Sequence, residues 1–130
     1  MVKKLKARTI LIIEDEADIR NFASRVLELE GYHVIQAEDS YRGIKAAREN
    51  PVALILLDLR MPGRNGWSLL GEMKSEPALS EIPVIVFTSM AEVLGRERAF
   101  SMGAADYLVK PLSAAGLRES VARILCQRKD

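Results

Sequence analysis

The sequence predicts an α/β fold in which helices cover both faces of a parallel β-sheet. Short runs rich in Ile, Val and Leu recur along the 130 residues and do not alternate with polar residues. Such runs are typical of strands buried on both faces of a parallel sheet. Segments with helical spacing of apolar residues separate the runs. Strands that alternate with helices imply right-handed crossovers between parallel strands, and here the order is strand then helix, five times over.

The five predicted strands differ in how deeply they are expected to be buried. Three runs are almost wholly aliphatic, which indicates central strands. The run after the turn-forming Gly31 is more polar, which indicates an edge strand. The predicted strands are 9–13 (TILII), 33–37 (HVIQA), 52–57 (VALILL), 83–87 (PVIVF) and 106–109 (DYLV).

Each predicted helix follows from an apolar stripe and from signals at its ends. The first, within 16–30, stops at Gly31. Ser40 is expected to cap the second helix, which ends at Asn50-Pro51, and Ser113 is expected to cap the last. The stripes expected to face the sheet are Ile19, Phe22, Ala23, Val26 and Leu27; Ile44 and Ala47; Leu69, Leu70 and Met73 within 66–75; Val93, Leu94, Ala99 and Phe100 within 91–102; and Leu117, Val121, Ile124 and Leu125.

Length and composition indicate a single domain over residues 1–130, with a core of about 8–127 and a basic leader at 1–7. A net charge of +1 gives no general attraction to nucleic acid or to anionic membrane. No apolar run approaches the ~20 residues of a membrane span, and no signal peptide is recognisable, so we expect a cytoplasmic protein. Cys126 is the only cysteine, which excludes an internal disulfide and a thiolate metal cluster; we expect it to be half-buried.

Polar residues follow four of the predicted strands at their carboxyl ends, where open parallel sheets place their functional crevice. Carboxylates gathered there would repel one another unless a cation lay between them, and a site of oxygen ligands without His or Cys suits Mg²⁺. An aspartate beside a cation and a lysine could accept a phosphoryl group as an acyl phosphate. The residues at these ends are Glu14-Asp15-Glu16, Asp58, Thr88-Ser89 and Lys110.

Four segments resemble the receiver domain of bacterial two-component response regulators, in the order and spacing of that family. The resemblance covers about residues 8 to 125. It implies a flavodoxin-like, doubly wound fold with five helices and five parallel strands in the order 2-1-3-4-5. The segments are "ILIIEDEADIR", "LILLDLRMPGRNGW", "VIVFTS" and "GAADYLVKPL".

The resemblance also implies a role for each site residue and for Mg²⁺ as the cofactor. Asp58 would be the phosphoacceptor, and Lys110-Pro111 would have a cis peptide bond. Mg²⁺ would bind Asp58, Asp15 and the backbone carbonyl of Arg60, with Glu14 acting through water. The remaining roles are Lys110 and Ser89 as contacts of the phosphoryl group, and Thr88 and Tyr107 as the switch residues.

The function implied is that of a switch rather than a turnover enzyme. A sensor histidine kinase or a histidine phosphotransfer protein would phosphorylate Asp58. The surface of the fourth helix, fifth strand and fifth helix would then change and control an output domain or an effector protein. We expect no direct binding of nucleic acid or membrane by this domain.

Three departures from the family pattern are visible, and two other functions remain open. Ser89 follows Thr88 where Ala or Gly is frequent in the family. Glu14 stands where Asp is commoner, and Leu112 replaces a Phe frequent in regulators that dimerise through the surface just described. A receiver-like interaction module that signals without phosphorylation predicts loss of an essential residue, but all are present. An aspartyl-phosphate phosphatase usually places a general acid two residues after its nucleophile, and that position is Arg60.

Overall fold

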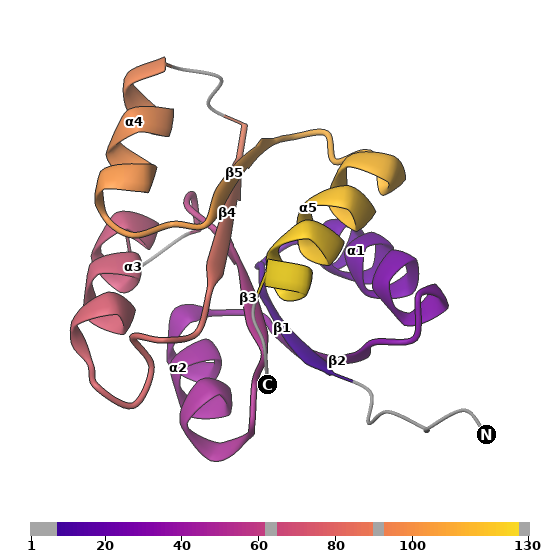
Figure 1. Ribbon diagram of the computed structural model, residues 1–130, viewed down its shortest axis with the longest axis horizontal. Coiled ribbons are helices and arrows are strands. Elements are labelled where there is room, and N and C mark those ends of the chain that lie inside the picture. Colours follow the sequence, from indigo (N-terminus) through magenta and orange to yellow (C-terminus); the bar gives the residue numbers. More distant parts are fainter. Residues whose placement is uncertain (1–7, 62–64, 90–92, 128–130) are drawn as a thin grey trace.

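The computed structural model describes residues 8–61, 65–89 and 93–127, without the side chains of 93 and 94. A five-stranded parallel sheet lies between two layers of helices (Figure 1). The strand order β2-β1-β3-β4-β5 is the one predicted. The elements are β1 Thr9–Ile13, α1 Ala17–Leu29, β2 His33–Ala37, α2 Ser40–Glu49, β3 Leu54–Asp58, α3 Gly66–Ser75, β4 Val84–Thr88, α4 Val93–Ser101, β5 Asp106–Val109 and α5 Ala114–Gln127.

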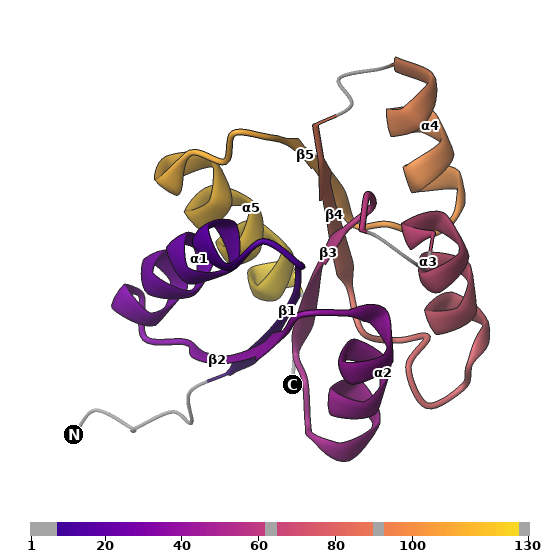
Figure 2. The same ribbon diagram turned by 180° about the vertical axis from the view of Figure 1, so that it is seen from behind.

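Two apolar clusters, one on each face of the sheet, form the core. α1 and α5 pack together over one face, and α2, α3 and α4 cover the other, as the view from behind in Figure 2 also shows. All five residues of β3 and of β4 are buried, which agrees with their unbroken aliphatic runs. β2 is an edge strand with partly exposed residues, as its more polar sequence predicts.

The ends of two central strands differ from the predicted ones. β3 begins at Leu54 and includes Asp58, because Asp58 pairs with Phe87 in the ladder and the amide of Leu59 donates to the carbonyl of Phe87 at 3.1 Å. β4 is Val84–Thr88, so Thr88 also belongs to a strand. Two of the polar groups predicted to follow strands are therefore their last residues, which fixes their main chains within the sheet.

The predicted cap of the second helix was wrong, and that of the last was right. Asp39 caps α2: its extended backbone lets Oδ1 accept a hydrogen bond from the amide of Arg42 at 2.7 Å. Ser40 is the first helical residue instead. At α5, the amide of Gly116 donates to Ser113 Oγ at 2.9 Å, as expected of a cap.

Three side chains are more exposed than predicted: Phe22 and Phe100, which were expected to face the sheet, and Cys126, which was expected to be half-buried. Phe22 is 43% exposed, because α1 turns Ala23, Val26 and Leu27 inward and leaves Phe22 on its flank. Phe100 is 41% exposed and packs under the guanidinium of Arg96, 5.5 Å from its ring centroid. Cys126 is exposed in the last turn of α5. The predicted inward positions of Val93 and Leu94 lie outside the described side chains.

Within the described residues, no helix is both long and apolar enough to cross a membrane.

Candidate functional site

The register of the sheet brings the predicted site residues to one edge. Ile13 of β1 lies opposite Leu57 of β3, so the residues that follow them, Glu14 and Asp58, stand at the same level. Thr88 of β4 lies opposite Val109 of β5, and the amide of Lys110 donates to the carbonyl of Thr88 at 2.8 Å. The carboxyl ends of four parallel strands therefore lie together, as we predicted from the polar residues at the ends of these strands.

Three carboxylates meet at this edge. Glu14, Asp15 and Asp58 each offer one oxygen within 4.8 Å of the others. Glu14 has no exposed surface and Asp58 is 1% exposed, whereas Asp15 is the more exposed of the three. Burying two acids this close together is costly unless positive charge accompanies them.

Lys110 supplies part of that charge. Its Nζ lies 3.2 Å from Asp58 Oδ2, to which it donates a hydrogen bond, and 3.0 Å from Glu14 Oε1. The peptide bond between Lys110 and Pro111 is cis, as predicted. The predicted phosphoacceptor Asp58, on β3, and the predicted lysine, just after β5, are thus in contact.

Backbone amides hold the other carboxylate oxygens in place. The amide of Glu16 donates to Glu14 Oε2 at 2.9 Å, and the amide of Arg60 donates to Asp58 Oδ1 at 3.0 Å. The sequence prediction gave Arg60 only a carbonyl role. The observed bond shows that its amide also orients Asp58.

Arg20 is a residue that the sequence analysis missed. It lies in the first turns of α1, and its guanidinium donates to the carbonyls of Glu14 and Asp15 at 2.8 and 3.4 Å and to Gln36 Oε1 at 3.0 Å. These bonds fasten the loop after β1 to β2. The signal in the sequence was the position of Arg20 four residues after Glu16, because residues with this spacing lie on the same face of a helix, here next to the strand end. In the structure, the amide of Arg20 donates to the carbonyl of Glu16 at 3.0 Å.

The loop after Asp58 closes tightly at Gly66. The amide of Gly66 donates to the carbonyl of Leu59 at 3.2 Å, and Arg60 bridges Asn65. A Cβ at position 66 would lie 2.5 Å from both the Cα and the carbonyl oxygen of Leu59, so only glycine fits there. Asn65 then caps α3 by accepting a hydrogen bond from the amide of Trp67 at 2.8 Å.

The remaining predicted site residues belong to β4 and β5 or directly follow β4, and they differ in exposure. Thr88 has no exposed surface, Tyr107 is buried, and Ser89 is exposed. Trp67, at the start of α3, is half-buried, and the guanidinium of Arg98 lies 4.3 Å from its ring centroid. This contact between α3 and α4 was not predicted.

The surroundings of Glu14 and Lys110 shift both of their pKa values upward. Burial raises the pKa of Glu14 from 4.5 to about 7, against the opposing effects of the Glu16 amide and Lys110, and the charge of Asp58 adds to the rise. Burial would lower the pKa of Lys110, but Glu14 and Asp58 outweigh it and raise that pKa above its ordinary value. Lys110 therefore stays charged, while Glu14 ionises only near neutral pH.

The raised pKa of Glu14 predicts a pH-dependent effect of Glu14→Gln on stability without divalent cations. A carboxyl group whose folded pKa exceeds its unfolded value stabilises the fold fully below pH 4.5, and this contribution is lost as pH rises through about 7. Glutamine cannot ionise. We expect the variant to melt a few degrees above the wild type at pH 8 and at nearly the same temperature at pH 5. Thermal unfolding in EDTA at both values tests this, and an equal difference at pH 5 and pH 8 would contradict it.

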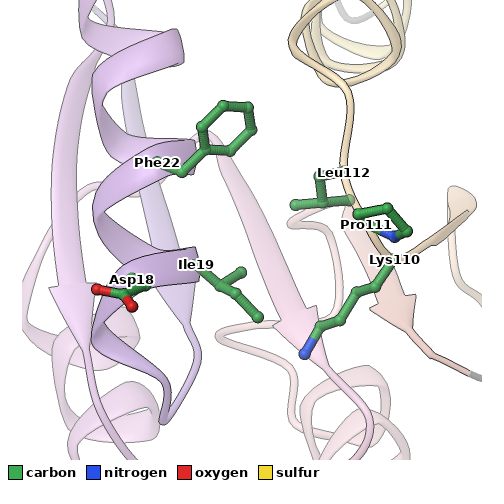
Figure 3. A pocket seen from close by; sticks show the side chains of 6 residues that line it. All are labelled: Asp18, Ile19, Phe22, Lys110, Pro111 and Leu112. Carbon is green, nitrogen blue, oxygen red and sulfur yellow. The ribbon is translucent and has the colours of Figure 1, made fainter.

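A groove of about 430 Å³ adjoins Lys110. In Figure 3, Ile19 and Phe22 of α1 face Pro111 and Leu112 of the loop after β5 across this groove. The exposure of Phe22 is thereby explained, because its ring forms one wall of the groove.

The donor set fits a small divalent cation. All the converging ligand atoms are oxygens, as Mg²⁺ prefers. Among the described residues, Glu14 Oε1 is buried and accepts no aligned hydrogen bond, although the ammonium of Lys110 lies near it. A buried carboxylate oxygen without a donor is a natural ligand for a metal ion.

Comparison with known proteins agrees with the fold and the motifs. The sequence model of the response regulator receiver domain matches residues 10–122. The phosphate regulon transcriptional regulatory protein PhoB of Escherichia coli is 40% identical over 118 residues, which are 91% of this chain and 50% of PhoB. The probable transcriptional regulator ycf27 of Porphyridium aerugineum is 33% identical over 93% of this chain and 49% of its own length. The chain thus spans about half the length of these relatives.

Solved structures with the same fold include chemotaxis protein CheY4 of Vibrio cholerae, with a TM-score of 0.86 at 23% identity over 92% of this chain and 99% of that one. NtrX of Brucella abortus, crystallised with ADP, has a TM-score of 0.86 at 29% identity over 94% of this chain and 28% of its own. The first likeness concerns the fold alone.

Proposed function

Because the chain belongs to the response regulator receiver domain family, we propose that it is a phosphorylation-controlled signalling module whose phosphoacceptor is Asp58. The observation that carries this proposal is the placement of a lysine ammonium 3.2 Å from a buried aspartate, beside two further acids. Such a site can receive a phosphoryl group and hold its negative charge. The domain acts as a switch in signal transduction rather than as a turnover enzyme.

In the proposed transfer, a carboxylate oxygen of Asp58 attacks the phosphorus of a phosphohistidine on a sensor histidine kinase or a histidine phosphotransfer protein. The P–N bond breaks as the P–O bond forms, and the imidazole nitrogen that leaves takes up a proton. Lys110 balances the charge on the phosphoryl oxygens from its position beside Oδ2, while the Arg60 amide keeps Oδ1 oriented. Transfer therefore depends mainly on positioning and charge.

Mg²⁺ is the proposed cofactor. Asp15, Asp58 and the carbonyl of Arg60 would bind it, and Glu14 would act as the fourth partner, directly or through water. When bound, the cation neutralises charge on the carboxylates and on the phosphoryl oxygens. Arg20 serves this group by holding the carbonyls of Glu14 and Asp15, which fixes the two acids relative to β3.

The proposed switch runs from the site to the surface of α4, β5 and α5. Thr88 ends the strand next to the one that ends at Asp58, and Ser89 follows it, which supports the proposal that their hydroxyls contact the phosphoryl group. Tyr107 lies on the neighbouring strand, in register with Val86. Phe100 and Val109 are large apolar residues exposed on this surface, which supports its use in contacts with an output domain or effector.

The groove beside Lys110 suits the phosphohistidine donor protein. It is lined largely by apolar side chains and opens next to the residue that contacts Asp58, so a partner seated there brings its phosphoryl group near the site. We expect Phe22→Ala to raise the KM for a phosphorylated histidine kinase by about five-fold or more, and to leave phosphorylation by acetyl phosphate unchanged. The kinase used is one that phosphorylates the wild-type chain.

Leu29→Ala is the matched control for Phe22→Ala. Leu29 is also an apolar residue of α1 but is 76% exposed and does not line the groove. An equal rise in KM for both variants, or slower reaction of Phe22→Ala with acetyl phosphate, would contradict the assignment of the groove to the donor protein.

The proposed function is tested by incubating the protein with acetyl phosphate with and without Mg²⁺, and following the mass of the intact chain. We expect one phosphoryl group to be gained with Mg²⁺ and none with EDTA. Asp15→Asn should weaken Mg²⁺ binding about tenfold or more, because a neutral amide is a poorer ligand. Glu16→Gln is its control, since Glu16 contributes its backbone amide to the site while its side chain is exposed.

Wild-type protein that gains no mass, or gains it equally in EDTA, would contradict the proposal and favour an interaction module that signals without phosphorylation.

The process that this domain controls is a separate proposal. Relatives about twice as long are named as transcriptional regulators, so we propose that this domain controls an effector that regulates transcription.

A further inference from the structure

The ammonium of Lys110 lies between two buried carboxylates. It is 3.2 Å from Asp58 Oδ2 and 3.0 Å from Glu14 Oε1, and it lies 5.3 Å from the ring centroid of Phe87. Its hydrogen bond goes to Asp58, while its closer ion pair is with Glu14. The ammonium therefore lies between the proposed phosphoacceptor and a second acid, which directly follows the neighbouring strand β1.

Glu14 has little freedom to move away from this arrangement. Its side chain has no exposed surface, the Glu16 amide binds Oε2, and Arg20 binds its carbonyl. These bonds aim Oε1 at Lys110, and no donor in the described part of the chain is aligned with that oxygen. The nearby ammonium thus balances the negative charge of Oε1. A divalent cation bound among the acids would balance that charge in place of the ammonium.

We propose that Glu14 is a positioning residue that draws Lys110 toward β1 and thereby makes Lys110 compete with Mg²⁺ for the carboxylates. The inference rests on the proposed function, because it assumes that Mg²⁺ binds these acids. An aspartate at this position would be one methylene shorter, about 1.5 Å. That difference takes an ion pair of 3.0 Å beyond the usual contact distance, so the ammonium would be held by Asp58 with less pull toward β1.

Like charges explain the competition. Lys110 lies next to an oxygen of two of the three carboxylates that would bind the cation, and two positive charges in a buried site repel strongly. Once the carboxylate of Glu14 binds a cation, Asp58 becomes the remaining carboxylate partner of Lys110 in the described structure. Glu14 would therefore link cation binding to the placement of Lys110 beside the residue to be phosphorylated.

The test is a double-mutant cycle of Mg²⁺ dissociation constants, measured by calorimetry without any phosphodonor. The proteins are wild type, Glu14→Asp, Lys110→Met and the double variant. We expect Glu14→Asp to bind Mg²⁺ about five-fold more tightly than wild type, but to change binding by less than about two-fold in the Lys110→Met background. Lys45→Met, which removes an exposed lysine of α2, is the control and should leave the affinity unchanged.

The outcomes separate this inference from the proposed function. Wild-type protein without saturable Mg²⁺ binding would contradict both. Saturable wild-type binding with no tightening by Glu14→Asp, or with equal changes in both backgrounds, would overturn this inference alone. Should Glu14→Asp not fold, Glu14→Gln takes its place. Its loss of affinity should then be about five-fold greater in the Lys110→Met background, where no competing ammonium remains to be relieved, and equal losses would overturn the inference.

Discussion

Replacing Asp58 with asparagine is expected to reduce phosphoryl uptake from acetyl phosphate by about 10³-fold or more, because an amide is not a nucleophile that forms an acyl phosphate. Asparagine has nearly the shape of aspartate, and its carbonyl oxygen can still accept the hydrogen bond from the Arg60 amide. The loss should therefore come from chemistry rather than from misfolding. Intact-protein mass spectrometry with Mg²⁺ present measures it, and thermal unfolding verifies that the variant is folded.

Asp39→Asn provides the matched control for this substitution. Asp39 caps α2 on the surface, and asparagine caps helices equally well, so both the fold and phosphoryl uptake should be kept. Undiminished uptake by Asp58→Asn, or a similar loss in Asp39→Asn, would show that Asp58 is not the phosphoacceptor.

Gly66→Ala is expected to be the most destabilising single-methyl addition described here. The new Cβ would lie 2.5 Å from the Cα and the carbonyl oxygen of Leu59, and a backbone contact of this kind cannot be relieved by a rotamer change. We expect a loss of about 3 kcal/mol or more in the free energy of unfolding. Because the loop closed by Gly66 also carries the Arg60 amide that orients Asp58, folded variant protein should be phosphorylated more slowly.

Gly71→Ala is the control in the same helix. The nearest atom to a Cβ at position 71 is the Met102 Cε at 3.6 Å, an ordinary contact, and alanine is a better helix former than glycine by about 1 kcal/mol. Urea unfolding should show that this variant is as stable as the wild type or more so. Equal stability of Gly66→Ala and wild type would contradict the close approach at Leu59.

Much of the fold could be predicted from sequence because the signals were local and consistent. Aliphatic runs such as 54–57 do not alternate, which fixes them as central parallel strands, and the polar residues that end them must then share one edge of the sheet. Asp58 and Lys110 meet there, as the motifs implied. The order of the strands followed from the family resemblance rather than from periodicity.

What the sequence did not predict depends on rotations and contacts across elements. The apolar stripe predicted to face the sheet from α1 wrongly included Phe22. Only the packing of the helix determines that Phe22 is exposed while Ser24 is buried. Asp39 and Ser40 are both good caps, and the chain geometry chose between them. The ion pair of Glu14 with Lys110 joins residues 96 positions apart (110 − 14), so no local pattern could have shown it.

The most direct test of the central claim is to locate the phosphoryl group. After phosphorylation with acetyl phosphate and Mg²⁺, borohydride reduces an aspartyl phosphate to homoserine, and mass spectrometry of the digested chain identifies the altered residue. We expect homoserine at position 58 and unmodified aspartate at positions 15 and 18. Homoserine at another position, or a phosphoryl group that borohydride does not remove, would contradict the assignment of Asp58 as the phosphoacceptor.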